Sequence, residues 1–338
     1  MRMQRIPNSA LTVSALCYGV AGFGTTVRGA EMERLYAAFR EAGGTFFDTA
    51  HCYCFWIPGG LGASERALGD VVRRHGDRQH VVLGTKGGHP AVGAAYPRPD
   101  RYLAPAVIAA DVGESLERLG VDCIDLYFLH RDDTRVPVGE IVGALDAEIA
   151  LGRIRCAGAS NWTTARIAEA NAYAAAHGLH GFVASQPQWN LAQPNLQDRA
   201  DPTMRFLAED EWQRHVRSGL PVVPYSPTAN GYFATGGQRG AAGFDNDVSR
   251  ARLRRAEELA ARKGCTPNQV ALAWLMHQPF PVIPILGTLQ YDHLTDALGA
   301  VGISLSPCEV QWLHSGAEAS TVGDSGEPIE PIAPGGPA

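Results

Sequence analysis

Short apolar runs alternate with segments of helical period along most of the chain. The apolar runs cover residues 16–20, 45–47, 81–84, 124–129, 154–157, 182–184, 221–224 and 282–286. The amphipathic segments between them predict helices over residues 31–41, 64–74, 105–119, 138–151, 163–177, 249–263 and 292–301. Apolar strands separated by helices are typical of a parallel sheet, so the pattern predicts an α/β protein.

The number of strand–helix units favours one particular α/β architecture. Eight apolar runs within about 300 residues predict a single (β/α)8 TIM barrel. A doubly wound open sheet is the alternative, but it would start with a Gly-x-Gly-x-x-Gly turn, which the segment at residues 19–24 matches only loosely. Residues 5–14 predict an N-terminal β-hairpin that could plug the bottom of the barrel. We expect one domain over residues 1–314.

Three segments depart from the strand–helix alternation. Residues 194–219 and 226–247 are longer than ordinary connections, so they are candidate binding loops at the C-terminal face of the barrel. Residues 315–338 contain Gly, Pro, Ser and acidic residues and no Lys or Arg. This composition predicts a flexible acidic tail.

Composition and charge exclude several classes of partner. The chain has 338 residues, 45% of them hydrophobic, a net charge of −6 and a pI near 6.0, so a nucleic-acid partner is not expected. No apolar run is long enough for a membrane span, and residues 1–9 have no signal-peptide core. Seven scattered cysteines are typical of reduced thiols. We therefore expect a cytoplasmic protein; the sequence does not indicate an oligomeric state.

Polar or ring-bearing side chains close seven of the eight predicted strands. In a (β/α)8 barrel these strand ends meet at one mouth, where catalytic residues collect. The residues are Asp48 with Tyr53 in the following loop, Lys86, His130, Ser160 with Asn161, Gln186 with Asn190, Tyr225 with Ser226, and Gly287 with Thr288. Each alone has an ordinary structural explanation, and their convergence is what indicates a site.

Asp48, Tyr53, Lys86 and His130 are the residue types of a proton-transfer site. A buried lysine beside a carboxylate stays charged, and its charge would lower the pKa of a neighbouring phenol. Tyr53 could then exchange a proton near neutral pH, and His130 could donate a hydrogen bond to a substrate oxygen. A carbonyl held there needs a hydride, which a nicotinamide cofactor would supply. The chain has only two lysines beside 27 arginines, which makes Lys86 conspicuous.

The same segments resemble the aldo-keto reductase family. The four residues stand in FDTAHCY, GTKGG and LYFLH, and the segments GASERALG, GASNW, SQPQWN, VVPYSP and VIPILGT also match that family in order. The resemblance covers residues 3–305. It implies a barrel that reduces the carbonyl of an aldehyde, ketone or sugar. Tyr53 would be the general acid, Lys86 and Asp48 would tune it, and His130 would orient the carbonyl.

The resemblance also implies a nicotinamide cofactor held by the later strand ends. Ser160, Asn161 and Gln186 would bind the carboxamide, and Tyr225 would stack on the nicotinamide ring. The remaining expected cofactor residues are Ser226, Gly231, Gly287, Thr288, Gln290 and His293.

One departure from the family bears on the choice of cofactor. Gln290 stands where the family usually has a basic residue against the 2′-phosphate of NADP, and no Lys or Arg follows Lys263. An arginine of the 226–247 loop, such as Arg239, could substitute. NADPH is the first expectation, and NADH stays open because of Gln290.

The substrate pocket is less well indicated. Phe23, Trp56, Trp162 and Trp189 lie near the strand ends in sequence and are expected to line it, although core packing would explain these rings as well. No particular substrate follows from the residues.

Three other functions fit parts of the pattern. His51, Cys52 and Cys54 suggest a metal site, but a second ligand pair is missing and His89 and His130 belong to other strands, so no metal is expected. Lys86 could be the nucleophile of a Schiff-base aldolase. The barrel could also bind the cofactor as a sensor or channel-associated subunit with little turnover.

Overall fold

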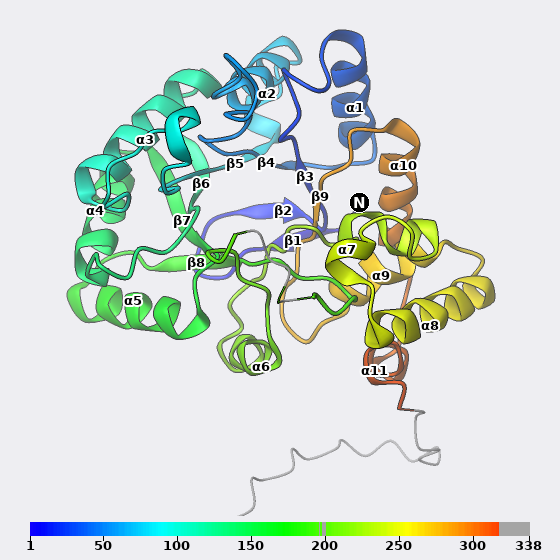
Figure 1. Ribbon diagram of the computed structural model, residues 1–338. Helices are drawn as coiled ribbons and strands as arrows, with labels where there is room; N and C mark the ends of the chain where they lie inside the picture. The colour runs from blue at the N-terminus through cyan, green and yellow to red at the C-terminus, as the bar shows by residue number, and fades with distance from the viewer. Residues whose placement is uncertain (196, 198–200, 318–338) are drawn as a thin grey trace, which may run out of the picture.

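The strands form one curled parallel sheet. We describe residues 1–195, 197 and 201–317 of a computed structural model. The sheet order is β8-β7-β6-β5-β4-β3-β9, so sequential strands are neighbours and the last strand returns to the first (Figure 1). The strands are β3 (Cys17–Gly19), β4 (Phe46–Asp48), β5 (Val82–Gly87), β6 (Ile124–Leu129), β7 (Ile154–Ser160), β8 (Phe182–Gln186) and β9 (Ile285–Leu286). This arrangement confirms the predicted α/β barrel.

The barrel closes through an interrupted strand. The predicted seventh strand, residues 221–224, forms only single bridges, in which Val222 pairs with Ser185 on one side and Val282 on the other. Backbone hydrogen bonds still connect this segment to its neighbours on both sides. Val223 N donates to Ser185 O over 2.8 Å, and Ile283 N donates to Val222 O over 2.9 Å. Prolines at 221, 224, 281 and 284 lack an N–H group, so a continuous ladder cannot form here.

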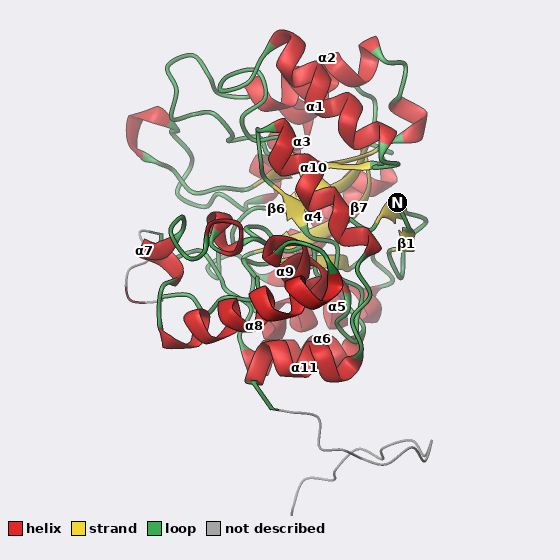
Figure 2. Cartoon of the chain, turned by 90° about the vertical axis from the view of Figure 1, so that its right-hand side faces the viewer, coloured by secondary structure: helices red, strands yellow, loops and turns green. Residues whose placement is uncertain are grey.

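Helices surround the strands on the outside (Figure 2). They are α1 (Gly29–Glu41), α2 (Ala63–Arg74), α3 (Pro105–Leu119), α4 (Val138–Ala150), α5 (Thr164–His177), α6 (Glu209–Ser218), α7 (Ala241–Phe244), α8 (Asp247–Lys263), α9 (Pro267–Met276), α10 (Tyr291–Gly299) and α11 (Pro307–Ser315). Short 3-10 helices are η1 (Arg78–His80), η2 (Gly93–Ala95), η4 (Ala229–Gly231), η5 (Phe233–Thr235) and η6 (Ala300–Gly302). Among the described residues, no helix is both long and apolar enough to cross a membrane.

All seven predicted helices are present, and α6, α7, α9 and α11 were not predicted. Helix α9 is buried along nearly its whole length, so it has no polar face and no amphipathic period to detect. Helices α6 and α7 lie inside the two segments that were predicted as long loops. Helix α11 runs to Ser315, the first residue of the predicted tail; residues 318–338 lie outside the described residues.

The N-terminal hairpin closes one end of the barrel, as predicted. Strands β1 (Met3–Arg5) and β2 (Thr12–Ser14) pair antiparallel, and Asn8 in the turn has a φ of 57°. Ile6, Leu11 and Val13 pack in one apolar cluster with side chains of the sheet such as Phe46. Figure 1 shows the hairpin across the centre of the ring of strands. The barrel interior is therefore a packed core, which leaves the opposite mouth for a site.

Candidate active site

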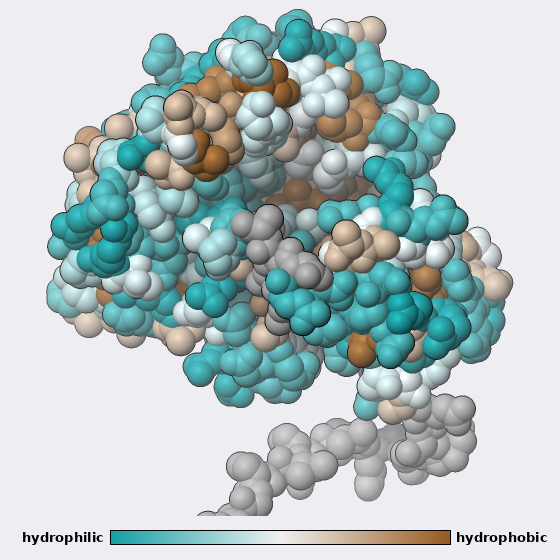
Figure 3. Space-filling model, in the orientation of Figure 1, coloured by the Kyte–Doolittle hydropathy of each residue, from teal (hydrophilic) through white to brown (hydrophobic). Residues whose placement is uncertain are grey.

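The carboxyl ends of the parallel strands meet at the mouth opposite the hairpin. Asp48 ends β4, Ser160 and Gln186 end the paired strands β7 and β8, and Lys86 lies one residue before the end of β5. His130 follows β6, and its N–H donates to the Gly87 carbonyl over 2.7 Å. Figure 3 shows this face, which is hollowed near its centre. The structure thus brings together residues that lie up to 138 positions apart.

Lys86 and Asp48 form a buried ion pair at the mouth. Lys86 Nζ donates to Asp48 Oδ2 over 2.5 Å and to the Thr49 carbonyl over 2.7 Å. The other carboxylate oxygen accepts a bond from Gln186 Nε2 over 3.0 Å. Burial alone would lower the pKa of Lys86, but Asp48 and then Tyr53 raise it well above its ordinary value. The ammonium therefore stays charged at neutral pH.

Tyr53 lies beside this pair, in the turn after β4. The Lys86 ammonium is 4.8 Å from the centre of the Tyr53 ring. Burial raises the pKa of the phenol, and the nearby Lys86 charge lowers it without cancelling the rise. Burial of the hydroxyl outweighs the lowering effect of the Lys86 charge, and the role of Lys86 in tuning Tyr53 stays a prediction. The hydroxyl is a protonated donor.

His130 faces Tyr53 across the mouth. The two ring centres are 5.9 Å apart and nearly perpendicular. Burial lowers the pKa of His130 well below its ordinary value, and the charge of Arg131 lowers it further. The imidazole is therefore neutral at pH 7 and carries one proton, on either Nδ1 or Nε2.

The Cys52 thiol is a neighbour of His130 that the sequence analysis did not assign to the site. Its sulfur lies 3.4 Å from His130 Nδ1, and burial raises the pKa of the thiol to about 12. The thiol is thus protonated, and a neutral imidazole nitrogen is a better acceptor than sulfur. An S–H bond to Nδ1 favours the tautomer of His130 with its proton on Nε2.

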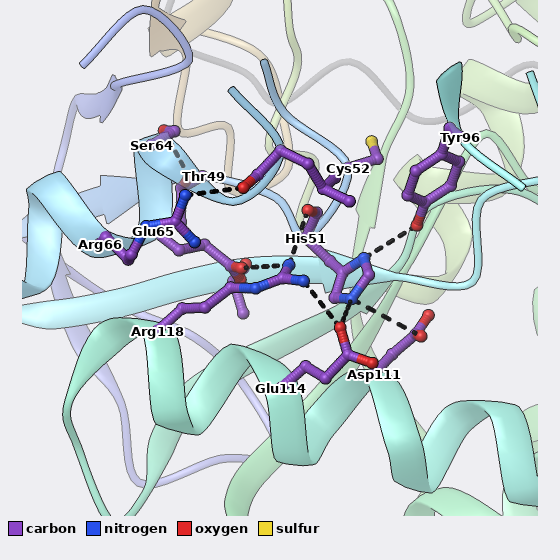
Figure 4. A network of polar contacts seen from close by, with 12 residues as sticks. Thr49, His51, Cys52, Ser64, Glu65, Arg66, Tyr96, Asp111, Glu114 and Arg118 are labelled. Atoms are coloured by element: carbon purple, nitrogen blue, oxygen red, sulfur yellow. Dashed lines mark hydrogen bonds and ion pairs between the residues drawn. The ribbon is translucent and has the colours of Figure 1, made fainter. Parts of the chain in front are cut away.

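His51 points away from the mouth, toward α3 (Figure 4). Its Nε2 lies 2.9 Å from Glu114 Oε2, and its Nδ1 lies 2.8 Å from the Tyr96 hydroxyl. The Arg118 guanidinium donates to the His51 carbonyl over 3.0 Å. The turn that carries Tyr53 is therefore anchored to α3 from behind.

The three metal-site candidates of the HCYC segment do not converge. His51 binds Glu114 on α3, and Cys54 Sγ donates to the Ala21 carbonyl over 3.1 Å. Cys52 points instead toward His130. Alternate residues of an irregular turn face different sides, which explains why adjacent metal-ligating residue types in sequence do not make one site.

The predicted carboxamide residues are connected by hydrogen bonds. Ser160 Oγ donates to the Gln186 carbonyl over 2.8 Å. Asn161 Nδ2 donates to the His130 carbonyl over 3.1 Å, and Asn161 Oδ1 accepts from the Tyr225 hydroxyl over 2.8 Å. Within the described part of the chain, the buried Oε1 of Gln186 has no hydrogen-bond partner. An orphaned acceptor of this kind is suited to a ligand N–H group.

The segment after residue 225 has unusual backbone geometry. Ser226, Ala229, Asn230 and Gly231 have φ values of 52°, 51°, 57° and 90°. Left-handed conformations are costly for residues with a Cβ atom and cluster at ligand-binding segments. Successive N–H groups in such turns can form a concave anion site.

Two arginines lie near the other predicted cofactor residues. Gln290 is the N-cap of α10, and both Gln290 and His293 are exposed there. The Arg34 guanidinium of α1 lies 3.8 Å above the Tyr291 ring. Arg239 packs on Gly231, where an added Cβ would be 3.6 Å from the Arg239 Cβ. Basic groups therefore lie close to both segments, although position 290 itself is uncharged.

Comparison with known proteins gives the same assignment as the motifs. The model of the aldo/keto reductase family matches residues 15–316. The chain belongs to this family. A solved structure of a thermostable aldo-keto reductase, Tm1743, in complex with the inhibitor epalrestat, is 23% identical and has a TM-score of 0.70. The match covers 93% of this chain and 99% of that one, and it supports the barrel fold. Family membership makes the protein an oxidoreductase of small carbonyl compounds.

The aromatic residues predicted to line the substrate pocket of this aldo-keto reductase occupy different places. Trp56 is 55% exposed and packs edge-on against Tyr53, with ring centres 6.3 Å apart. Phe23 and Trp162 are buried in the core between strands and helices. Trp189 packs on Trp274 in a second core cluster.

Trp56 thus lies beside Tyr53, and the Trp189 N–H donates to the Tyr225 carbonyl over 3.3 Å. A role of the four rings in substrate binding stays a prediction. Their sequence positions after the strand ends did not reveal where each ring packs, because the irregular loops that carry them set the direction of the side chains.

Proposed function

We propose that this aldo-keto reductase transfers a hydride from NADPH to the carbonyl carbon of a small aldehyde, ketone or sugar, and that Tyr53 protonates the carbonyl oxygen. The observation that carries this proposal is the buried array at the mouth, in which Lys86 bonds Asp48 and lies against Tyr53 while His130 faces the same ring. The array combines a protonated phenol with a fixed positive charge.

Each residue has a separate part in the proton transfer. Tyr53 gives its hydroxyl proton to the substrate oxygen as negative charge develops there. The charged Lys86 stabilises the resulting phenolate, and Asp48 keeps Lys86 in position. His130 donates its Nε2–H to the same oxygen, because the Cys52 thiol occupies Nδ1. Solvent then returns a proton to Tyr53.

Several features support a nicotinamide cofactor beside this array. Gln186 offers its orphaned Oε1 to the carboxamide N–H of the cofactor, whose dihydronicotinamide ring supplies the hydride. Tyr225, which Asn161 holds through a 2.8 Å bond, provides an aromatic face. The segment from Ser226 to Gly231 has the left-handed backbone that clusters at ligand-binding sites, which supports the assignment of the pyrophosphate to it.

NADPH is favoured over NADH by the position of Arg239. Its side chain is exposed and packs on Gly231. A guanidinium of this kind can bind a phosphate with two hydrogen bonds. Arg239 would thus replace the basic residue absent from position 290.

The alternative functions are less well supported. A Schiff-base aldolase needs a neutral lysine nucleophile, whereas Asp48 raises the pKa of Lys86. A sensor with little turnover would not need a protonated Tyr53 beside a charged lysine and a neutral His130. The first test is a fluorescence titration of the protein with NADPH and with NADH, followed by an aldehyde-dependent oxidation assay.

Three outcomes of that test are informative. Tighter binding of NADPH together with turnover is the expected result. Tight binding without turnover of any of several aldehydes, ketones and sugars would favour the sensor function. Binding of neither cofactor would refute the proposal, and borohydride trapping of a ketose on Lys86 would then be the next experiment.

A further inference from the structure

A different set of metal-binding residue types, which shares Cys52 with the HCYC segment, converges at the mouth. Cys52, His89 and His130 each place one potential ligand atom within 4.8 Å of the other two. They follow three neighbouring strands, β4, β5 and β6. Cys52, His89 and His130 are 2%, 9% and 7% exposed. The three side chains therefore form a compact, nearly buried cluster that adjoins Tyr53.

The closest pair already has the spacing of a tetrahedral metal site. Cys52 Sγ and His130 Nδ1 are 3.4 Å apart. A tetrahedral zinc ion with ordinary Zn–S and Zn–N bonds holds its sulfur and nitrogen ligands about 3.5 Å apart. An ion can thus replace the thiol proton between these two atoms with little movement of either side chain. The third ligand must come closer by about 1 Å to reach a comparable spacing.

His89 has the orientation expected of a third ligand. Its Nδ1 lies 2.8 Å from the Pro90 carbonyl oxygen. Because a carbonyl oxygen only accepts, Nδ1 carries the proton of the neutral ring and Nε2 carries the lone pair. A backbone carbonyl that fixes the tautomer in this way is the usual outer partner of a metal-bound histidine. The His89 and His130 ring centres are 4.9 Å apart, so the two imidazoles are in contact.

We propose that Cys52, His89 and His130 form a binding site for Zn²⁺ or a similar thiophilic transition-metal ion, and that the bound ion inhibits the reductase. Sulfur and imidazole ligands select such ions over Mg²⁺ or Ca²⁺. Binding converts the Cys52 thiol into a metal-bound thiolate and releases its proton to solvent. With three protein ligands, the fourth coordination position is left for water.

Inhibition is expected because the metal ion and the carbonyl substrate both need the His130 ring. In the proposed reaction Cys52 donates to Nδ1 of His130, and the ring is free to orient a carbonyl beside Tyr53. The bound ion instead fixes the ring to Cys52 and His89 and takes up space at the mouth. This part of the inference rests on the proposed function, whereas the binding of the ion does not.

Cobalt spectroscopy tests the site without any catalytic assay. Co²⁺ is added to the reduced wild-type protein and to the Cys52→Ser, His89→Gln and Cys308→Ser variants, with folding checked by circular dichroism. We expect a thiolate-to-cobalt charge-transfer band in the wild type and in Cys308→Ser, whose cysteine is exposed elsewhere. The band disappears in Cys52→Ser, and Co²⁺ affinity falls more than about 10-fold in His89→Gln. An unchanged band in folded Cys52→Ser refutes the site, and unchanged affinity in His89→Gln refutes the three-residue set.

Zinc inhibition tests the consequence separately. The rate of each variant is compared with its own rate in the absence of zinc, and EDTA is then added. We expect inhibition of the wild type that EDTA reverses, and at least a 10-fold higher zinc concentration for the same inhibition in His89→Gln. Equal zinc sensitivity of wild type and His89→Gln refutes the inhibitory site. Absence of turnover without zinc contradicts the proposed function instead, and the cobalt experiment still decides whether the site exists.

Discussion

The strand ends that hold Asp48, Lys86 and His130 differ from those that hold Tyr225 and Ser226. On the first side, β4, β5 and β6 pair along continuous parallel ladders. On the second side the prolines leave only single bridges at Val222, and the backbone continues into left-handed turns. Regular pairing suits a fixed array of side chains, whereas the interrupted strand leads into a left-handed segment of the kind that clusters at ligand-binding sites.

Asn161 connects the two sides. Its amide donates to the His130 carbonyl on the first side, and its Oδ1 accepts from the Tyr225 hydroxyl on the second. Its own φ of 60° is one that asparagine tolerates better than most residues. The two sides are thus joined by the side chain of one strained residue, although their proposed tasks differ.

The largest expected effect is a loss of turnover on the side of the mouth formed by the ends of β4, β5 and β6. Tyr53→Phe removes the proposed proton donor and should lower kcat by about 10²–10⁴-fold, while the Kd for NADPH stays unchanged. Stopped-flow or steady-state oxidation of NADPH measures the first quantity, and fluorescence titration measures the second. Tyr36→Phe, which alters a buried tyrosine bonded to Asp77 outside the mouth, is the control. Near-normal turnover of Tyr53→Phe would remove the catalytic assignment.

The next prediction compares the loss of stability when each of the two lysines of the chain is replaced. Lys86→Met leaves the buried Asp48 carboxylate without its ion pair and should lower the free energy of unfolding by about 3–5 kcal/mol. Lys263→Met breaks a more exposed pair with Glu309 and should cost less than about 1 kcal/mol. Urea denaturation of both variants measures the difference. Equal losses would mean that burial of the Lys86 pair is not what distinguishes this side.

On the second side, which holds Tyr225 and Ser226, Arg239→Ala should weaken NADPH binding by about 10-fold and leave NADH binding unchanged. The physical reason is the loss of a guanidinium partner for the 2′-phosphate. Arg254→Ala, which alters an exposed arginine of α8, serves as the control. Fluorescence titrations with both cofactors give the four affinities. A parallel loss for NADPH and NADH would place Arg239 outside 2′-phosphate recognition.

The smallest effect concerns the left-handed turn itself. Asn230 is exposed and has a φ of 57°, a conformation that glycine adopts without a Cβ penalty. Asn230→Gly should therefore raise the free energy of unfolding by about 0.5–1 kcal/mol. Ala261→Gly in α8 should lower it by about 1 kcal/mol, since the helix gives glycine no such advantage. Thermal or urea denaturation that shows the same sign for both substitutions would contradict this account of the turn.

The strands on the second side were also the ones that the sequence predicted least well. The runs at residues 221–224 and 282–286 were correctly placed as the closing strands, yet only Ile285–Leu286 forms a strand. Helix α9 was missed because its sequence is apolar on every side. By contrast, α5 (Thr164–His177) nearly matches the predicted helix over residues 163–177, since helix ends depend on bonds between near neighbours, such as the one that Arg166 N donates to Thr163 Oγ1.

The sequence by itself determined the order of strands and helices, the barrel class and the residues at the strand ends, because these depend on period, capping and short motifs. Only the tertiary structure decided where each side chain points. It turned His51 outward to Glu114, buried Trp162 in the outer core, and brought Cys52, His89 and His130 together at the mouth. The physical reason is that parallel strands adjacent in the sheet align residues far apart in sequence, while the pleat and the turns choose the side each residue faces.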